Sequence, residues 1–307
     1  MTPSFTPLSP GARVAIVAPS GAAKPSLIEH SLTLMRSWGL EPVLGPHVGA
    51  GHPRASYLSA TDADRAADLQ WAWTDPSIDA VFCARGGYGA TRMLDLLDVD
   101  ALRSARAKPI FGSSDATAIA EFWLERLGVG FWFAPMLATE PMVSDPAAMA
   151  DLHRAVFEPV VGHEFRSPTA TTLVSGTATG RLIGGNLSLL ALTLGERSRP
   201  QLNNSGAIAL IEEVTEPTYR IDGFLTALLR AGWFDGVTGI ALGSWLDCGP
   251  ADEIRALCLE LLGPLGVPLV WELGFGHDVA AQSMPLGATG TLFADEQPRL
   301  RITSVGE

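Results

Sequence analysis

Short apolar runs alternate with amphipathic segments throughout the first half of the sequence, and this alternation restricts the fold more than any other feature. The apolar runs predict strands at 14–18, 42–44, 78–83 and 109–111. The amphipathic segments predict helices at 26–38, 61–73, 90–97 and 115–127. A chain that alternates strands and helices in this way is expected to form a parallel sheet with helices on both faces.

The pattern loosens between 146 and 172 and then resumes with different content. Strands are predicted at 177–183, 207–211, 239–242 and 268–270, helices at 186–194, 219–231 and 252–262, and a hairpin at 288–303. We therefore expect an N-terminal Rossmann- or flavodoxin-like α/β domain over 1–150, a linker over 151–172, and a smaller C-terminal α/β domain over 173–307. The cleft between two such lobes is the expected place for a ligand.

Charge and composition exclude several classes of partner. The formal net charge of −12 argues against nucleic acid, because proteins that neutralise phosphates present basic surfaces. No apolar stretch reaches the ~18 residues that a membrane span needs, and segment 1–20 does not have the basic and apolar regions of a signal peptide. The three cysteines lie far apart and predict no disulfide framework. We expect a cytoplasmic protein with no membrane partner.

The motifs that hold phosphates and metals are missing from the sequence. The glycine-rich segment 85–89 follows a predicted strand, but it does not have the GxGxxG spacing, and GxxxxGK[ST] occurs nowhere. HExxH is also absent, and the six histidines show no paired ligand spacing. His47 and His52 share a Gly-rich loop, for which a solvated loop is the better interpretation. We expect no metal and no organic cofactor.

The segment PIFGSSDATA at 109–118 is the most informative in the chain. A strand is predicted to end near Gly112 and a helix to begin near Asp115, which presents Ser114 at a sharp bend beside the N–H groups of a helix N-terminus. Such donors can stabilise an oxyanion, and small residues two positions either side, here Gly112 and Ala116, are what a nucleophile elbow requires. Serine is also a common helix N-cap, and this segment alone favours the cap.

A nucleophilic serine needs a base and a group that orients the base. His277 lies in the loop after the strand predicted at 268–270, and the apolar run from 208 leads directly into Glu212 and Glu213. A carboxylate at the end of a buried strand can accept the second N–H of a histidine. All these residues follow the carboxyl ends of predicted strands, which is the usual active-site edge of open α/β sheets.

Six segments together resemble the LD-carboxypeptidase family of serine peptidases. They are VAPSG (17–21), RGGYGATRML (85–94), FGSSDATAI (111–119), GGNLSLL (184–190), EEVTEPTYRID (212–222) and GFGH with MPLG (274–287). They occur in the order of the family and extend over nearly the whole chain. The resemblance implies an N-terminal α/β lobe that carries the nucleophile and a C-terminal α/β lobe that carries the acid and the histidine.

Carried over by position, the resemblance implies that Ser114 is the nucleophile, His277 the general base and Glu212 its orienting acid. The backbone N–H groups of Asp115 and of the turn at Gly86 would form the oxyanion hole. Tyr88 and Asn186 are the expected substrate contacts.

Alternatives remain at several of these positions. Ser113 commonly corresponds to an aromatic residue in the family, and it could be the attacking serine. Glu213 or Glu216 could orient the histidine in place of Glu212. Gln282 or Ser283 could supply the polar residue that often follows the histidine in the family.

The resemblance further implies a homodimer that removes the terminal D-alanine from the tetrapeptide stem of cell-wall muropeptides during recycling. Its substrate would be a small peptide cleaved at an amide between an L-centre and a D-residue. One alternative is a microcin-type immunity peptidase that cleaves a peptidyl-nucleotide antibiotic, for which Trp132, Trp245 and Trp271 are candidate stacking groups. Another is a two-lobed binding protein without catalytic activity, which would explain the cleft but not the coincidence of serine, acid and histidine.

Overall fold

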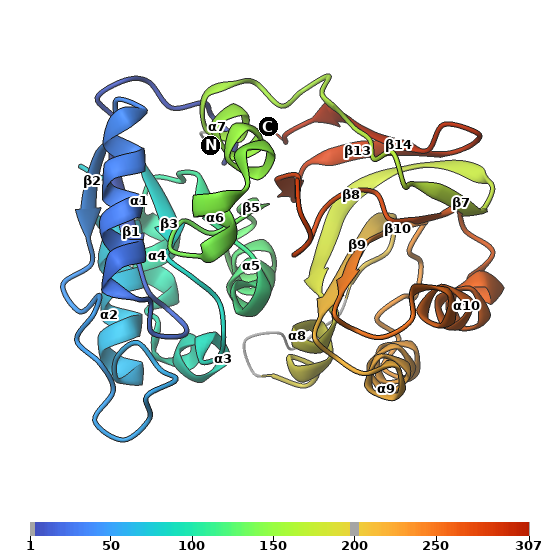
Figure 1. Ribbon diagram of the computed structural model, residues 1–307, viewed down its shortest axis with the longest axis horizontal. Helices are drawn as coiled ribbons and strands as arrows, with labels where there is room; N and C mark the ends of the chain where they lie inside the picture. Colours follow the sequence, from blue (N-terminus) through green and yellow to red (C-terminus); the bar gives the residue numbers. More distant parts are fainter. Residues whose placement is uncertain (1–3, 197–202, 307) are drawn as a thin grey trace.

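The computed structural model describes residues 4–196 and 203–306, which form two α/β lobes side by side (Figure 1). The N-lobe is built on a sheet with the strand order β12-β5-β4-β3-β1-β2. Its strands are β1 (Arg13–Val17), β2 (Glu41–Leu44), β3 (Ala80–Cys83), β4 (Ile110–Gly112), β5 (Phe131–Phe133) and β12 (Met284–Leu286). Strands β1 to β5 are parallel, in the flavodoxin-like order 2-1-3-4-5. The predicted fold class is confirmed.

Helices cover the N-lobe sheet on both faces, as the alternation predicts. They are α1 (Pro25–Ser37), α2 (Asp62–Thr74), α3 (Ala90–Met93), α4 (Val99–Ser104), α5 (Thr117–Phe122), α6 (Glu140–Ser144) and α7 (Pro146–Phe157). The helix predicted at 115–127 is irregular at both ends: a 3₁₀ turn, Ser114–Ala116, precedes α5, and a π-helical turn, Trp123–Leu127, follows it. A 3₁₀ start is tighter than an α-helical one, so it sharpens the bend after β4.

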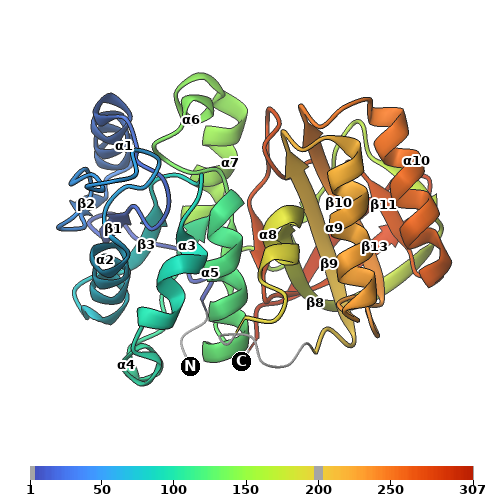
Figure 2. The ribbon, with the colours of Figure 1, turned by 90° about the horizontal axis from the view of Figure 1, so that it is seen from below.

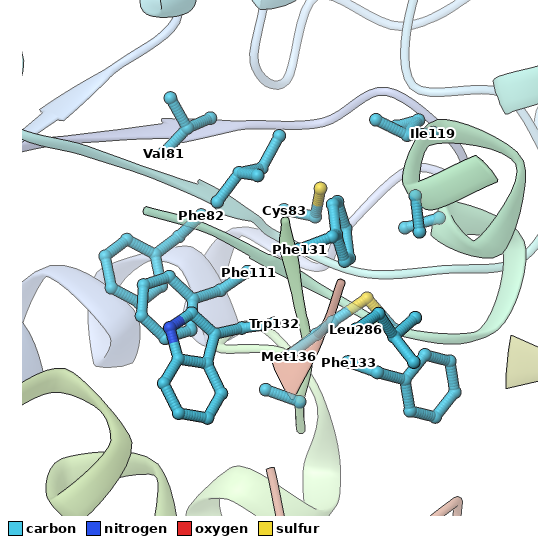
Figure 3. Packing of buried hydrophobic residues seen from close by; sticks show 14 of the residues in the cluster. Val81, Phe82, Cys83, Phe111, Ile119, Phe131, Trp132, Phe133, Met136 and Leu286 are labelled. Carbon is cyan, nitrogen blue, oxygen red and sulfur yellow. The ribbon is translucent and has the colours of Figure 1, made fainter. Parts of the chain in front are cut away.

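The N-lobe core is held by aromatic residues on adjacent strands. Phe82 on β3 stacks on Phe111 on β4 at 4.4 Å between ring centroids, and Phe111 stacks on Trp132 on β5 at 5.8 Å. Figure 3 shows these three rings stacked one on another, with Phe131 and Leu286 in the same cluster of buried residues but apart from the stack. Leu286 belongs to β12, which comes from the far end of the sequence and pairs antiparallel with β5. The C-terminal part of the chain therefore completes the N-lobe sheet.

The C-lobe is built on a second sheet with the order β6-β14-β13-β8-β9-β10-β11-β7. Its strands are β6 (Glu164–Phe165), β7 (Thr171–Val174), β8 (Gly176–Asn186), β9 (Ala207–Val214), β10 (Gly239–Leu246), β11 (Leu269–Trp271), β13 (Thr289–Ala294) and β14 (Arg299–Ser304). Strands β8 to β11 are parallel, and the others flank them in antiparallel pairs. The predicted terminal hairpin corresponds to β13 and β14.

Helices α9 (Thr218–Arg230) and α10 (Ala251–Leu262) lie on one face of the C-lobe sheet, as Figure 2 shows. The short helix α8 (Leu187–Leu192) contacts α5 at the boundary between the lobes. The range 151–172, which was expected to be a linker, contains most of α7, the strand β6 and the start of β7. Among the described residues, every helix is too short or too polar to span a bilayer.

Candidate active site

Ser114 lies in the bend between β4 and α5, in a backbone conformation that few residues other than glycine adopt. Its φ is 56°. Left-handed backbone at such a residue costs of order 1 kcal/mol and tends to occur at functional sites. Its neighbour Ser113 is extended and only 5% exposed, whereas Ser114 is partly exposed. The strained conformation therefore presents the hydroxyl of Ser114, and that of Ser113 is buried.

Glycine is required where the loop after β3 meets this bend. A Cβ atom added to Gly86 would lie 2.7 Å from the Cβ of Ser114 and 2.8 Å from its Oγ. A Cβ added to Gly112 would lie 2.9 Å from the Cβ of Ala116. The two carbon–carbon distances, 2.7 and 2.9 Å, are shorter than a van der Waals contact between carbon atoms allows. The close approach explains why the two predicted motifs, RGGYG and GSSD, contain glycine at these positions.

The peptide group between Gly86 and Gly87 has a fixed orientation. The carbonyl oxygen of Gly86 accepts hydrogen bonds from the N–H of Gly21 at 3.1 Å and from Nε of Arg85 at 3.2 Å. Because a trans peptide is planar, the N–H of Gly87 points to the opposite side. This N–H and that of Asp115 are the donors that the turn can offer to an oxyanion. The sequence analysis named Gly86 as the residue of this turn that donates to the oxyanion. The N–H group of the peptide described here belongs to the next residue, Gly87.

The carboxylate of Asp115 ties the two turns together. It is 1% exposed and accepts a hydrogen bond from the N–H of Ala90 at 2.8 Å. Burial raises the pKa of Asp115, and hydrogen bonds to the loop at 89–90 oppose that rise. The residue that follows Ser114 therefore anchors the end of the RGGYG loop.

His277 and Glu212 form a hydrogen-bonded pair in the C-lobe. Nδ1 of His277 lies 2.7 Å from Oε2 of Glu212, which is fully buried near the end of β9. The backbone N–H of His277 donates to Oγ of Ser244 on β10 at 2.9 Å. Burial by itself would lower the pKa of His277, but the charge and hydrogen bond of Glu212, with the charge of Glu213, raise it overall. This is the electrostatic arrangement of a histidine that accepts a proton.

Asn186 joins two adjacent buried carboxylates. Its Nδ2 donates to Oε1 of Glu212 at 3.2 Å and to Oε1 of Glu213 at 2.8 Å. The other oxygen of Glu213 accepts the N–H of Ser188 at 2.7 Å. Burial raises the pKa of Glu213, and the charge of Glu212 adds to that rise. Of the acids considered from sequence, only Glu212 contacts the histidine, and Glu216 forms a surface ion pair with Arg220 at 2.9 Å.

The expected substrate contacts Tyr88 and Asn186 differ in their surroundings. Asn186 is 2% exposed, and its side-chain amide is occupied by the two glutamates. Tyr88 is 46% exposed, and its ring centroid lies 6.1 Å from that of Tyr57. Asn186 is therefore positioned to orient the acid, whereas Tyr88 is accessible to a ligand.

The first turn of α5 connects the Ser114 bend to the residues that surround the buried carboxylates of β9. The N–H of Asn186 donates to Oγ1 of Thr117 at 3.0 Å, and Asn186 lies opposite Glu212 in the β8–β9 register. Ser114 is therefore close in sequence to Thr117, which contacts the end of β8, and the Asn186 side chain at that end binds Glu212. In the described part of the chain, the hydroxyl of Ser114 makes no direct hydrogen bond to His277. Catalytic hydrogen bonds are often long without substrate and shorten in its complex.

The loop at 272–283 carries His277 from the C-lobe sheet to the N-lobe sheet, and α7 holds its far half. Oδ2 of Asp145 accepts the N–H of Ala280, and Oδ2 of Asp151 accepts the N–H of Ser283, both at 2.6 Å. Gln282 donates to the carbonyl of Arg166 at 2.9 Å. Of the two polar residues expected after the histidine, Gln282 fixes the loop through its side chain, whereas Ser283 does so through its backbone N–H.

Several residues that support the site were not found from the sequence. Arg65 is 1% exposed and donates to the carbonyl oxygens of Pro19 and Gly89, which joins two loops of the site. The signal for it was an arginine on the apolar stripe of α2, beside Leu69 and Ala72. Ser244 gave a similar signal, because a serine interrupts the apolar run of β10.

The residues that the structure describes contain no group of three or more His, Cys, Asp or Glu side chains arranged to hold a metal ion. His47, which shares the Gly-rich loop with His52, instead pairs with Asp68 at 2.7 Å.

Comparison with known proteins shows relatives along nearly the whole length. A Streptomyces coelicolor protein, a carboxypeptidase by name, is 47% identical over 94% of this chain and 92% of its own. The murein tetrapeptide carboxypeptidase of Pseudomonas aeruginosa is 31% identical over 94% of both chains. The crystal structure of muramoyltetrapeptide carboxypeptidase from Oxalobacter formigenes matches with a TM-score of 0.81 and 25% identity, over 95% of this chain and 98% of that one.

The microcin C7 self immunity protein MccF in its wild-type apo state has the same fold. Its TM-score is 0.85 at 20% identity, over 98% of this chain and 99% of that one. Residues 14–134 match the LD-carboxypeptidase N-terminal domain, and residues 179–292 match the LD-carboxypeptidase C-terminal domain. With the strained serine turn in one lobe and the histidine–glutamate pair in the other, these matches show that the chain belongs to the LD-carboxypeptidase family.

Proposed function

We propose that this protein is a serine carboxypeptidase that releases the terminal D-alanine from muropeptide tetrapeptides by cleaving the amide between an L-centre and the D-residue. The observation that carries the proposal is the buried Glu212–His277 pair at 2.7 Å, in contact through Asn186 and Thr117 with the turn that presents Ser114. The murein tetrapeptide carboxypeptidase of Pseudomonas aeruginosa, 31% identical over 94% of this chain, supports the choice of substrate.

In the first half of the reaction, Nε2 of His277 accepts the proton of the Ser114 hydroxyl as Oγ attacks the scissile carbonyl carbon. The carbonyl oxygen becomes an oxyanion, and the N–H groups of Asp115 and Gly87 stabilise it. His277 then gives the proton to the nitrogen of the departing D-alanine, and the C–N bond breaks. The product is free D-alanine and an ester between Ser114 and the remaining peptide.

In the second half, water takes the place of the departing amine. His277 accepts a proton from the water, whose oxygen attacks the ester carbonyl, and then returns a proton to Oγ of Ser114. Glu212 accepts the Nδ1–H of His277 throughout, which fixes the tautomer with Nε2 toward the serine and stabilises the imidazolium. The whole cycle uses side chains and backbone donors of this chain.

The proposal extends to cellular context. Muropeptide stems that reach the cytoplasm during cell-wall recycling would be the physiological substrate, and the enzyme would act there as a homodimer. Sedimentation of the purified protein tests the dimer directly, because a monomer at micromolar concentration would contradict it.

The rival functions have less support. The likeness to MccF at 20% identity concerns the fold alone. Trp132, Trp245 and Trp271, the candidate stacking groups for a nucleobase, are 1%, 8% and 4% exposed and so present little ring surface to a ligand. A binding protein without catalytic activity would not require a buried carboxylate paired with a histidine.

The test measures D-alanine release from a purified tetrapeptide, with a peptidyl-adenylate as the competing substrate. We expect the tetrapeptide to be cleaved, Ser114→Ala to abolish cleavage, and the matched change Ser113→Ala to leave most of it. Cleavage that survives Ser114→Ala would rule out the mechanism. A wild-type protein that cleaves only the peptidyl-adenylate would transfer the assignment to the immunity class.

A further inference from the structure

A pocket of about 560 Å³ opens beside the Ser114 turn, at the edge of the N-lobe sheet where the strand order reverses. We call it the Arg85 pocket. It is lined by Ala22, Ser56, Tyr57, Arg85, Gly87 and Tyr88. These residues belong to the loops that follow β1, β2 and β3. In open α/β sheets, the crevice between two strands whose connections run in opposite directions is the usual ligand site, and here those strands are β1 and β3.

Arg85 brings a positive charge into this pocket, and the described part of the chain supplies no acidic partner for it. Its Nε donates to the carbonyl oxygen of Gly86 at 3.2 Å, and its Nη1 donates to that of Ala22 at 3.1 Å. Both acceptors are neutral. Nearby Arg92, in contrast, pairs with Asp62 at 2.7 Å. Within the described residues, no carboxylate lies within ion-pair distance of Arg85, although the chain has a net charge of −12.

The guanidinium and the nucleophile both lie against Gly86. Nε of Arg85 binds its carbonyl oxygen, and a Cβ added to Gly86 would lie 2.8 Å from Oγ of Ser114. In a peptide cleaved at its last bond, the free carboxylate lies one residue, about 3.5 Å of chain, beyond the attacked carbonyl. Because Arg85 and Ser114 both contact Gly86, the cation lies on the side of the serine where an exopeptidase would need a donor for that carboxylate.

The exposed rings of Tyr57 and Tyr88 line the same pocket. They are 53% and 46% exposed, and their centroids are 6.1 Å apart. Side chains of this kind reduce the access of water to a bound carboxylate, which strengthens its charge-assisted hydrogen bonds to a guanidinium. Ala22 and Gly87, which also line the pocket, have a small side chain and none, respectively.

We propose that the Arg85 pocket binds the free α-carboxylate of the departing C-terminal residue, and that Arg85 restricts the enzyme to the last residue of the peptide. The inference rests on the proposed function, because it assigns the leaving-group side of that reaction. Nη2 of Arg85, with its two N–H groups, is the donor toward the carboxylate. Nε and Nη1 hold the guanidinium in place through the two carbonyl oxygens.

The experiment compares kcat/KM for a tetrapeptide with a free C-terminus and for the same peptide with a C-terminal amide. We expect wild-type enzyme to prefer the free acid by about 10- to 100-fold, as hydrogen bonds to a charged group imply. Arg85→Gln should bring that ratio close to one. Arg85→Lys should give an intermediate ratio, because lysine keeps the charge but does not have the paired N–H donors of a planar guanidinium. Arg54→Gln, an equal change of charge on the neighbouring exposed loop, should keep the wild-type ratio.

The acid-to-amide ratio separates recognition from damage to the loop, because a distorted oxyanion turn lowers both rates together. If wild-type enzyme cleaves both peptides equally well, or if Arg85→Gln lowers both rates and keeps the ratio, the proposal is wrong while the proposed function stands. If wild-type enzyme cleaves neither peptide, the proposed function itself fails. Calorimetric binding of both peptides to Ser114→Ala gives the same comparison without catalysis, and tighter binding of the free acid is expected there.

Discussion

The two halves of the site are built in different ways. The Ser114 turn, which carries the proposed nucleophile, is local: the left-handed backbone and the close contact at Gly86 arise from two short loops of the N-lobe. The base is assembled over a long range, because His277 contacts Glu212 on β9 and Ser244 on β10, while α7 holds the far half of its loop. The orientation of Ser114 depends on steric contacts in its turn, whereas the pKa of His277 depends on the buried charges beside it.

This difference predicts how each half fails. A substitution in the nucleophile turn should displace the serine without altering any ionisation. A substitution in the base network should leave the serine in place and change the charge or orientation of His277. The experiments below separate these two outcomes.

The largest effect is expected for Glu212→Gln, which removes the charge but keeps the shape. The imidazolium that forms during attack would lose its partner, and the amide could reverse the tautomer of His277. We expect kcat/KM to fall by about 10³- to 10⁴-fold. Glu216→Gln is the matched control, because Glu216 pairs with Arg220 at the surface, and it should stay within about twofold of wild type. A loss below tenfold for Glu212→Gln would show that another acid orients the histidine.

Gly86→Ala should have the next largest effect, and it addresses the other half of the site. The added Cβ would lie 2.7 Å from that of Ser114, so the serine must move. A displacement of about 1 Å can cost ~10²-fold in kcat/KM. Since the φ of Gly86 is not in the left-handed region, the alanine is compatible with the backbone, and the loss of stability is limited to the overpacking, about 1–3 kcal/mol.

Gly223→Ala is the control for this change. It introduces the same methyl group into α9, where nothing lies within 4 Å, and it should stabilise the protein by up to about 1 kcal/mol with activity unchanged. Full activity in Gly86→Ala would mean that the close contact does not position the serine.

The same contrast explains what could be predicted from the sequence. The parallel N-lobe sheet, the terminal hairpin and the bend before α5 have local signals in periodicity and in glycine positions. The strands β5 and β12 are short, and β12 pairs with β5 across about 150 residues of sequence, a distance at which periodicity carries no information.

The candidate site divides in the same way. The Ser114 turn could be located from its own segment, although that segment alone favoured a helix cap. Nothing local distinguishes Glu212 from Glu213, because side chains of consecutive strand residues ordinarily face opposite sides. Here both are buried, and only the position of the loop that carries His277 shows which one it contacts. Arg65 and Ser244 gave a local signal as polar residues in apolar patterns, but their partners lie in distant loops.

Ser244→Ala should have a smaller effect than either substitution above. The Oγ atom accepts the backbone N–H groups of His277 at 2.9 Å and of Asp278 at 3.3 Å, so its removal loosens the loop but leaves the Glu212 contact in place. We expect kcat to fall by about 5- to 30-fold with KM little changed, since each of the two hydrogen bonds contributes ~1 kcal/mol. Ser304→Ala, at an exposed end of β14, is the control and should have no effect. An increase in KM alone would place Ser244 in substrate binding.

The smallest effect expected concerns the acid limb of the pH profile. His277 acts as a base only when it is neutral, and its pKa lies above the ordinary value of 6.5, so kcat/KM should rise with pH through a midpoint above 6.5. The charge of Glu213 contributes to that rise without touching the imidazole. Glu213→Gln should therefore move the midpoint toward lower pH, provided that thermal melting shows the variant to be folded. If the midpoint does not move in the folded variant, Glu212 raises the pKa of His277 without a contribution from Glu213. A midpoint below 6.5 in wild type would mean that burial, and not the two carboxylates, sets the pKa of His277.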